Sequence, residues 1–495
     1  MGGFLLGIDA GSSSIKASLV SIDKGVAVAT TAYPEKEMAI ISLKSGWAEQ
    51  RPETWWANLK KAVARLRVLA GKKIDGIEAI GISYQMHGLV VVDRNQNVLR
   101  PSIIWCDSRA VNTGENAFKA IGEDKCLRHL LNSPGNFTAS KLKWVQDSEP
   151  ELYRKIHKMM LPGDYLAMKL TGEIGTTVPG LSEGILWDFR NKSLAGMVLD
   201  HYGIDRSLVP PVLPVFSVQG YLSAAAAKQT GLKKGVPVAY RAGDQPNNAF
   251  SLNVLHPGEV AATAGTSGVI YGITDKPDYD PRSRVNTFVH VNHTDENPRF
   301  GVLLCINGTG ILNRWIKDQT AGNSYESMNR LAGKSGIGSN GLVILPFGNG
   351  AERVLGNRDI QAEINGLNFN IHKKADLYRA AQEGIVFALK YGFDILQSMH
   401  MKSDVVKAGK SNMFLSSLFR EAFVNTTGAV VELYNTDGAQ GAARGAGIGA
   451  GIFKNTREAF FGLKTTTRIE PDAALSRLYR ESYDHWLLQL NKKLI

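Results

Sequence analysis

Two short turns of glycine and hydroxyl residues are the part of the sequence best suited to bind phosphate. They are Gly11-Ser12-Ser13 and Gly265-Thr266-Ser267. Glycine lets backbone N–H groups approach a phosphate oxygen without a side chain in between, and hydroxyl groups add donors. We expect Gly11 and Gly265 to bring backbone amides to the phosphates of one nucleotide from two sides. We also expect a branched side chain at either glycine to strain the backbone.

Two aspartates are placed to take part in phosphoryl transfer. Asp9 ends an apolar strand just before the first turn, where a carboxylate can hold Mg²⁺ through water. Asp244 follows another apolar strand and is placed to accept the proton of an attacking hydroxyl group. A helix cap or turn aspartate is an equally good interpretation of Asp244. Lys16, beyond the turn, either reaches a phosphate or is a solvated strand lysine.

Polar and aromatic residues follow two further strand patterns. His87 is either a ligand-binding residue or a core histidine with its hydrogen bonds satisfied. Trp105 is suited to line a sugar site, while Asp107 and Arg109 have the spacing of a structural ion pair. The sequence contains no His-Glu-x-x-His or Cys-x-x-Cys spacing and no complete P-loop pattern, so these metal, redox and nucleotide motifs are excluded.

The elements that position these residues alternate between strands and helices. Apolar runs predict strands at residues 4–8, 15–22, 77–83 and 89–93, and a helix that opens at Arg51-Pro52 or at Thr54. This alternation indicates an α/β architecture. The glycines and alanines of residues 445–450 fit a dinucleotide fingerprint only loosely, so they indicate close packing of a helix instead.

The sequence repeats itself near its midpoint. Residues 10–15 match residues 264–269 position by position, and each copy lies between two apolar strands. We therefore predict two related domains, residues 1–251 and 252–495. Chance similarity between two turns of small residues is the alternative.

The bulk composition narrows the class of protein. A chain of 495 residues exceeds one ordinary core. The net charge is +11, but the basic residues are spread along the chain, so we expect no nucleic acid partner. No apolar run approaches the roughly 18 residues of a membrane span, and the start lacks a signal-peptide pattern. We expect a cytoplasmic protein that binds small molecules and no membrane. The sequence leaves open whether the protein forms a homodimer.

Together these motifs resemble the FGGY carbohydrate kinases, whose two ribonuclease-H-like domains have the fold of actin-like ATPases. The resemblance runs from Gly7 to about Gly451. Residues 7–16 and 265–268 are similar to the two phosphate hairpins of the family, and residues 243–245 to the segment that holds its catalytic base. The resemblance implies that each domain has a mixed five-stranded sheet flanked by helices and that the two domains close about a hinge. It also implies an interdomain catalytic cleft, ATP and Mg²⁺ as cofactors, and Asp244 as the general base.

Within the family, residues 85–88 and 99–109 look most like those of xylulokinases, which implies D-xylulose as the sugar. The sugar contacts implied are Gln85, Met86, His87, Trp105, Asn136, Asp244 and Gln245. The nucleotide contacts implied are Gly11, Ser12, Ser13, Lys16, Gly265, Thr266, Ser267, Gly308, Gly409, Lys410 and Asn412, with Asp9 as a catalytic residue that binds the metal. Residues 407–412 lack the triple glycine common in the adenine-binding segment of the family, which puts the nucleotide preference in doubt.

Three rival functions stay open. The first is another sugar kinase of the same family, acting on gluconate, ribulose or a deoxyketose. The second is a chaperone-like ATPase of the same superfold, and the third is an inactive sugar sensor. Intact Asp9, Gly11, Thr266 and Asp244 disfavour the sensor.

Overall fold

The computed structural model describes residues 2–320, 324–401 and 403–495 and divides into two compact units. Unit 1 comprises Met1–Asn253, Phe288–Phe300 and Thr436–Leu463, and unit 2 comprises Val254–Thr287, Gly301–Asn435 and Lys464–Ile495. The first segment of unit 1 ends close to the predicted boundary at residue 251. Two later segments also belong to unit 1, so the two units are not separated at one position of the chain. The predicted domain bounds therefore stay a prediction.

Unit 1 is built on a mixed sheet of five strands in the order β13-β5-β1-β2-β3. The strands are β1 (Phe4–Ala10), β2 (Ile15–Ser21), β3 (Ala27–Tyr33), β5 (Ile77–Tyr84) and β13 (Val238–Gly243). β1 pairs antiparallel with β2 and parallel with β5, and β13 pairs parallel with β5. The predicted strand at 89–93 is β6 (Val90–Val92), which pairs with β8 (Lys158–Met160) outside this sheet.

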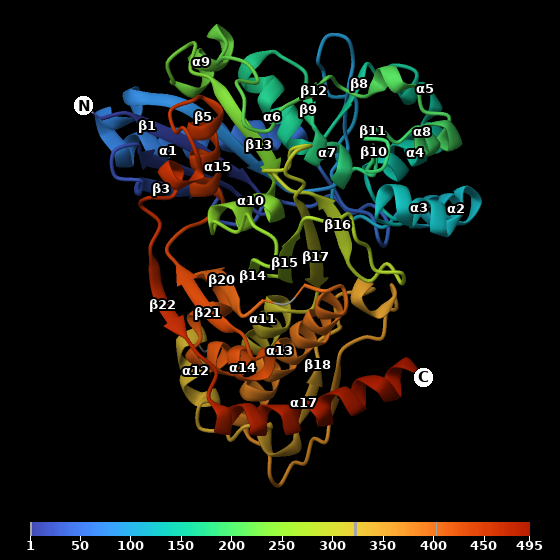
Figure 1. The fold of residues 1–495 in the computed structure, drawn as a ribbon, viewed down its shortest axis with the longest axis vertical. Helices are drawn as coiled ribbons and strands as arrows, with labels where there is room; N and C mark the ends of the chain where they lie inside the picture. The colour runs from blue at the N-terminus through green and yellow to red at the C-terminus, as the bar shows by residue number, and fades with distance from the viewer. Residues whose placement is uncertain (1, 321–323, 402) are drawn as a thin grey trace. The chain divides into compact units, whose positions relative to one another are not determined.

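Two helices far apart in sequence cover opposite faces of this sheet. Helix α1 (Pro52–Ala70) begins with its proline at the first turn, as predicted, and Trp55 packs in one core cluster with Leu6 and Ile8. Helix α15 (Gly438–Gly449) packs against β1, β5 and β13. Successive strand residues point to opposite faces, so Gly7 faces α15. Figure 1 shows the red α15 beside the blue β1.

Glycines let α15 approach the strands backbone to backbone. A Cβ at Gly7 would lie 1.7 Å from Ala439 O, and one at Gly81 would lie 1.9 Å from Ala442 O. A Cβ at Gly445 would lie 2.5 Å from the Tyr240 ring. The interpretation of residues 445–450 as close helix packing is therefore confirmed.

The other helices and short strands of unit 1 surround this core. The helices are α2 (Val111–Ile121), α3 (Glu123–Leu130), α4 (Thr138–Ser148), α5 (Pro150–Tyr153), α6 (Pro162–Thr171), α7 (Val178–Glu183), α8 (Gly196–Tyr202), α9 (Ala224–Thr230), α10 (Asp244–Ser251) and α16 (Thr456–Ala459). The short strands are β4 (Glu49–Gln50), β7 (Ser102–Ile103), β9 (Thr176–Thr177), β10 (Trp187–Asp188), β11 (Ser193–Leu194) and β12 (Val212–Leu213).

Unit 2 repeats the pattern of the first sheet and extends it. Its inner strands are β17 (Phe300–Ile306), β15 (Gly268–Thr274), β14 (Val260–Ala264), β20 (Val405–Gly409) and β21 (Val430–Tyr434), in that order. β14 pairs antiparallel with β15 and parallel with β20, as β1 does with β2 and β5. The prediction of five strands is wrong for this sheet, because β16 (Asn286–Val289) and β22 (Thr465–Ile469) add one strand at each edge and give seven strands.

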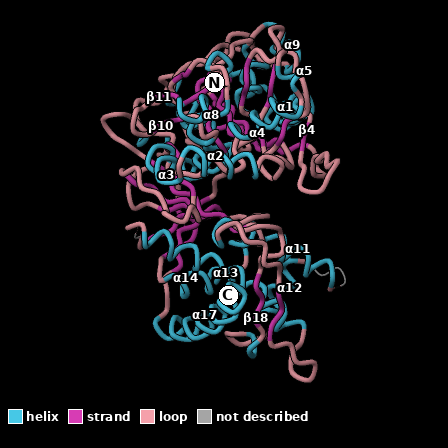
Figure 2. The backbone as a smooth tube through the Cα atoms, turned by 90° about the vertical axis from the view of Figure 1, so that its right-hand side faces the viewer, coloured by secondary structure: helices cyan, strands magenta, loops and turns pink. Residues whose placement is uncertain are grey.

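The helices of unit 2 form a second core against this sheet. Helices α13 (Lys374–Ser398), α14 (Ser417–Thr427) and α17 (Ala473–Leu494) pack against one another, and Figure 2 shows them in cyan. The smaller elements are α11 (Gly310–Gln319), α12 (Tyr325–Ala332), β18 (Val343–Leu345) and β19 (Glu363–Asn365).

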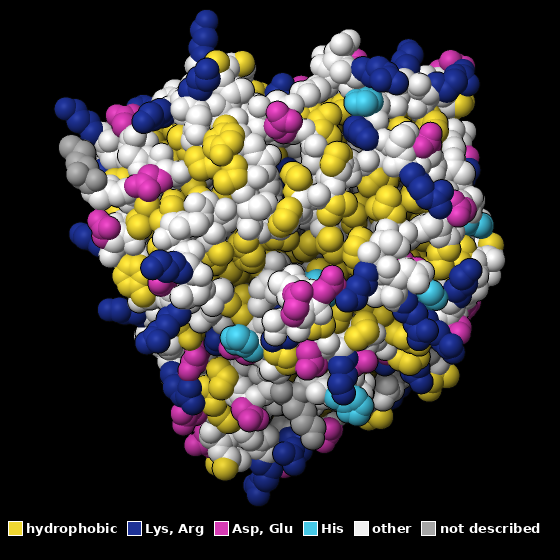
Figure 3. Space-filling view, turned by 45° about the horizontal axis from the view of Figure 1, so that its top comes forward, with side chains coloured by type: hydrophobic (Ala, Val, Ile, Leu, Met, Phe, Trp, Pro, Cys, Tyr) yellow, Lys and Arg dark blue, Asp and Glu magenta, His cyan; other side chains and the backbone are white. Residues whose placement is uncertain are grey.

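The surface carries charge of both signs. On the face shown in Figure 3, Lys and Arg side chains are scattered among Asp and Glu rather than gathered in one patch. Within the described ranges, every helix is too short or too polar to cross a membrane.

Candidate active site

Asp9 lies at the end of β1, between β2, β5 and the start of α15. In the register of the sheet, Asp9 lies opposite Lys16 of β2 and beside Ser83 of β5. Its Oδ1 accepts a hydrogen bond of 2.8 Å from the Ser83 hydroxyl group. Its Oδ2 lies so close to α15 that a Cβ at Gly438 would come within 2.7 Å. Burial raises the pKa of Asp9, whereas the Lys16 charge and the Ser83 hydrogen bond lower it.

The surroundings of Asp9 fit Mg²⁺ bound mainly by phosphate. No group of three or more His, Cys, Asp or Glu residues within the described ranges is placed to hold a metal ion. Mg²⁺ usually keeps several waters and takes only one or two carboxylates beside substrate phosphates. A fixed carboxylate next to the first turn therefore suits this ion.

The first turn is held from three directions. Gly11 N donates to Ser14 O at 3.1 Å, and Gln50 Nε2 donates to Ser12 O at 2.7 Å. Trp105 Nε1 donates to Ser12 Oγ at 3.4 Å. The Gly11 amide closes the turn in this structure, and the contact of Gly11 with phosphate stays a prediction. Gly11 also lacks a positive φ, and a Cβ there would lie in ordinary contact at 3.5 Å from Ser14 O.

Asp244 begins α10 directly after β13. Burial and then the negative charge of Asp9 raise the pKa of Asp244 to about 7, although hydrogen bonds from its own backbone and from Gln245 lower it. Asn247 of the same helix donates to Gly438 O at 2.8 Å, which ties α10 to α15 beside Asp9. A carboxyl group that titrates near neutral pH is well suited to general-base catalysis.

The loop after β5 places His87 in a fixed orientation. Its Nδ1 lies 2.9 Å from the carbonyl oxygen of Glu183. A carbonyl oxygen can only accept, so Nδ1 carries the hydrogen and Nε2 of a neutral ring is an acceptor. The ring packs edge-on against Phe137 at 4.9 Å.

The same loop is joined to the first turn through one glutamine. Gln85 is 2% exposed, and its Nε2 donates to Gln50 Oε1 at 3.2 Å. Gln50 also holds Ser12 O. Met86 is 4% exposed and lies against Gly243, where a Cβ would come within 2.7 Å of its Cγ. The predicted sugar loop and phosphate turn are therefore neighbours in unit 1.

Three of the predicted sugar-binding residues carry a buried oxygen without a hydrogen-bond partner in the described structure. These oxygens are Gln85 Oε1, Asn136 Oδ1 and Gln245 Oε1. A buried acceptor without a partner costs about 1–3 kcal/mol. The hydroxyl groups of a polyol are donors of the kind that these oxygens need.

Trp105 and Asn136 flank a structural ion pair. Trp105 is 38% exposed, and Asn136 Nδ2 donates to Asp107 O. Arg109 binds the Asp107 carboxylate at 2.7 Å, and its guanidinium lies 3.8 Å from the centre of the Trp47 ring. The structural interpretation of Asp107 and Arg109 is thereby confirmed.

Lys141 of α4 joins two of these segments and was missed in the sequence. Its side chain is fully buried, and its Nζ donates to His87 O at 2.9 Å and to Ile104 O at 3.0 Å. Burial lowers the pKa of Lys141 to about 8. In the sequence, a buried lysine on an amphipathic helix cannot be distinguished from a solvated lysine.

The second turn, in unit 2, lies against the start of α11. Gly310 N donates to Gly265 O at 2.9 Å, and Ile311 N donates to Thr266 O at 3.2 Å. A Cβ at Gly265 would lie 3.4 Å from Asn412 Nδ2, and Gly265 has no positive φ. The structure therefore brings residues 265–267 and Asn412 together.

The other predicted nucleotide residues of unit 2 lie in the backbone around this turn. Gly308 packs so closely that a Cβ would lie 1.5 Å from Pro346 O, and its amide donates to Glu352 Oε1 at 3.2 Å. Burial raises the pKa of Glu352 to about 7 against the opposing effect of these backbone donors. Gly409 ends β20, and the exposed Lys410 donates its amide to Tyr434 O at 2.9 Å.

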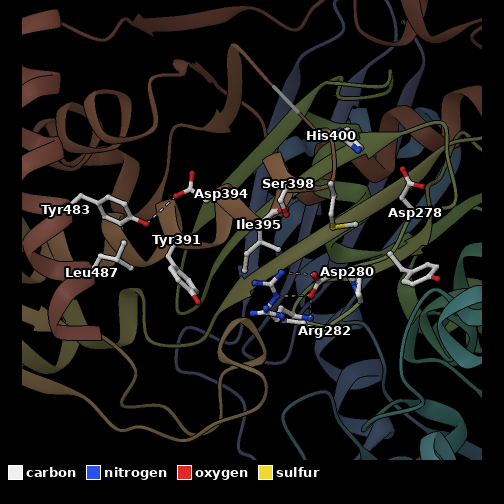
Figure 4. Close-up of a pocket in the computed structure, with 14 residues that line it drawn as sticks. Asp278, Asp280, Arg282, Tyr391, Asp394, Ile395, Ser398, His400, Tyr483 and Leu487 are labelled. Carbon is white, nitrogen blue, oxygen red and sulfur yellow. Dashed lines mark hydrogen bonds and ion pairs between the residues drawn. The ribbon is translucent and has the colours of Figure 1, made fainter. Parts of the chain in front are cut away.

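A cavity of about 780 Å³ in unit 2 lies apart from these residues. Figure 4 shows its walls, which include Tyr391 and Asp394 of α13 and Tyr483 of α17. Polar side chains of its lining bind one another: Arg284 binds Asp280 at 2.7 Å, and the Tyr483 hydroxyl group donates to Asp394 at 3.3 Å. Its described lining contains none of the predicted site residues.

Comparisons with known proteins agree with these features. The N-terminal domain of the FGGY family of carbohydrate kinases matches residues 4–251, and the C-terminal domain matches residues 260–452. A xylulose kinase from Bacillus subtilis is 28% identical over 501 residues, which cover 97% of each chain.

Solved structures share the fold across nearly the whole chain. The xylulose kinase from Rhodospirillum rubrum is 25% identical with a TM-score of 0.86, covering 99% of this chain and 98% of its own. The gluconate kinase from Lactobacillus acidophilus shares the fold at 22% identity and a TM-score of 0.87, covering 100% and 99%. Because its two family domains together span most of its length, this chain belongs to the FGGY family of carbohydrate kinases.

Proposed function

We propose that the protein transfers the γ-phosphoryl group of ATP to the terminal hydroxyl group of D-xylulose, which yields D-xylulose 5-phosphate. The observation that carries the proposal is the set of three buried oxygens, on Gln85, Asn136 and Gln245, that lack partners beside His87 and Asp244. Hydroxyl groups of an open-chain sugar would satisfy them. The names of the relatives, xylulose kinases over almost the whole chain, support the choice of sugar.

Asp244 is the general base in this proposal. It takes the proton from the terminal hydroxyl group, and the oxygen then attacks the γ-phosphorus in line. Asp9 holds Mg²⁺, which when bound neutralises charge on the phosphate groups. The two turns bind phosphate groups of ATP, and exclusion of water from the reacting groups removes the competing acceptor. The compartment proposed is the cytoplasm.

A panel of acceptors tests the substrate. We expect the coupled release of ADP to be fastest with D-xylulose among ketoses, polyols and aldonic acids. A higher kcat/KM for gluconate, ribulose or a deoxyketose would replace the sugar and leave the kinase class intact. ATP hydrolysis that responds to an unfolded protein but to none of the carbohydrates would favour the chaperone-like rival.

Replacing His87 with alanine should lower kcat/KM for the sugar by roughly 5- to 150-fold. The reason is the loss of one polar contact, which is worth ~1–3 kcal/mol. Hydrolysis of ATP without sugar should fall far less, because His87 belongs to the sugar loop. Equal losses in the coupled assay and in the sugar-free assay would identify His87 as a structural residue.

A further inference from the structure

Glu183, the last residue of α7, holds His87 from two sides. Its carbonyl oxygen accepts from His87 Nδ1 at 2.9 Å. Its carboxyl group accepts hydrogen bonds from the His87 backbone N–H and from the Tyr84 hydroxyl group. Lys141 holds the His87 carbonyl oxygen. The amide, the carbonyl group and one ring nitrogen of His87 are therefore all fixed.

The backbone of His87 needs such support. His87 has φ 61, in the left-handed region that strains a residue with a side chain. A strained conformation persists only where the surrounding contacts determine it. Glu183 and Lys141 supply these contacts, so they set the direction of the imidazole ring.

The Glu183 carboxyl group also lies against Gly243, the residue that precedes Asp244. A Cβ at Gly243 would come within 2.5 Å of Glu183 Oε2. The Glu183 residue is 1% exposed, and its Oε1 has no hydrogen-bond partner in the described structure. Asp164 nearby is paired with Arg241 at 3.1 Å, whereas no Lys or Arg within the described ranges forms an ion pair with Glu183.

A negative charge at this place would be costly. A buried carboxylate without a cation loses its hydration, and a second carboxylate nearby adds repulsion. Burial, then Asp244 and Asp164, raise the pKa of Glu183 well above its usual range, against the two hydrogen bonds from His87 and Tyr84. Of two neighbouring buried carboxyl groups, one is expected to stay protonated at neutral pH.

We infer that Glu183 is a neutral carboxylic acid that positions His87, and that Asp244 alone provides the ionised carboxylate of this pair. The inference rests on the proposed roles of His87 and Asp244 in sugar phosphorylation. Glu183 is a positioning residue, because its contacts are to His87, Tyr84 and the backbone before Asp244. Neutral glutamine can accept the same two hydrogen bonds, whereas leucine cannot.

Kinetics of two variants test the positioning role. Glu183→Leu should lower kcat/KM for the accepted sugar by about 10- to 100-fold, since a misplaced contact near the reacting group has effects of that order. The KM for ATP should change by less than about threefold. Glu183→Gln should recover most of the loss and keep the wild-type pH profile. Wild-type kinetics in Glu183→Leu would overturn the inference, as would a loss in Glu183→Gln as large as that in Asp244→Asn.

Infrared spectra of the full chain test the protonation state without any substrate. At pH 7 the wild type should show a set of protonated-carboxyl carbonyl bands, one of which disappears in Glu183→Gln. The matched control is Asp280→Asn, which removes a carboxylate paired with Arg284 and should leave that band in place. Absence of a Glu183-dependent band would overturn the inference even if Glu183→Leu fails to fold. A wrong choice of sugar would not change this result, so the two failures are distinguishable.

Discussion

Asp244→Asn should lower turnover at saturating sugar by about 10²- to 10⁴-fold, the usual contribution of a general base. Asparagine keeps the shape of the side chain at the start of α10, but it cannot take the proton of the sugar. Thermal melts with and without MgATP should show that folding and nucleotide binding are nearly intact. A variant with more than half of wild-type turnover would contradict the assignment of Asp244 as the base.

The pH profile provides the internal control for this variant. The pKa of Asp244 is raised to about 7, so below that pH the carboxyl group is protonated and cannot accept a proton. We therefore expect wild-type kcat/KM for the sugar to fall as the pH drops below about 7 and to level off above it. The residual activity of Asp244→Asn should lack this acid limb.

Valine at Gly11 or at Gly265 should weaken MgATP binding by about 10- to 100-fold, because the added side chain would keep phosphate oxygens away from the hydrogen-bond donors of the turn, and a hydrogen bond to a charged group is worth ~1.5–3 kcal/mol. The two glycines lie in different units, yet each branched side chain should obstruct the same ligand. Neither glycine has a positive φ, and a Cβ at either site meets other atoms only at 3.4 Å or beyond. The strain expected from the sequence is therefore small, which makes the test cleaner.

Thermal melts separate a binding defect from a folding defect in these variants. A ligand at about 100 times its Kd stabilises the folded state by ~2.7 kcal/mol. Each valine variant should lose this nucleotide-induced rise in Tm and keep nearly the wild-type Tm without nucleotide. The matched control is Gly336→Val, since a Cβ there meets no atom within 4 Å. Normal MgATP binding by Gly265→Val alone would show that the second turn is only a hairpin.

Local patterns predicted the elements whose own residues carry a strong signal. The apolar runs of β1, β2 and β5 and the proline at the start of α1 appear where the sequence indicated them. Contacts between distant segments were not predictable in the same way. The edge strand β22 pairs with β21, and its largely exposed residues Thr465–Ile469 lack the apolar run that marks the inner strands.

The candidate site shows the same limit at the level of single residues. The two turns could be singled out as candidates because they combine an unusual composition with a strand on either side, and Asp244 because it follows an apolar strand pattern. Glu183 and Lys141 were missed, because an isolated acid or base within a helix is usually solvated. Their burial, 1% and 0% exposed, appears only once α4, α7 and the His87 loop are packed together. The use of the Gly11 amide within its own turn is likewise a matter of three-dimensional geometry.

The packing of α15 on β1 and β5 has a consequence for synthesis of the chain. The ribosome releases residues at about 5–20 per second, so β1 waits for tens of seconds before residues 438–449 emerge. During that interval the face of the sheet at Gly7 and Gly81 has no helix to cover it. Any polypeptide released before α15 is translated therefore keeps an uncovered sheet face, which makes incomplete products a target for holding chaperones and proteases.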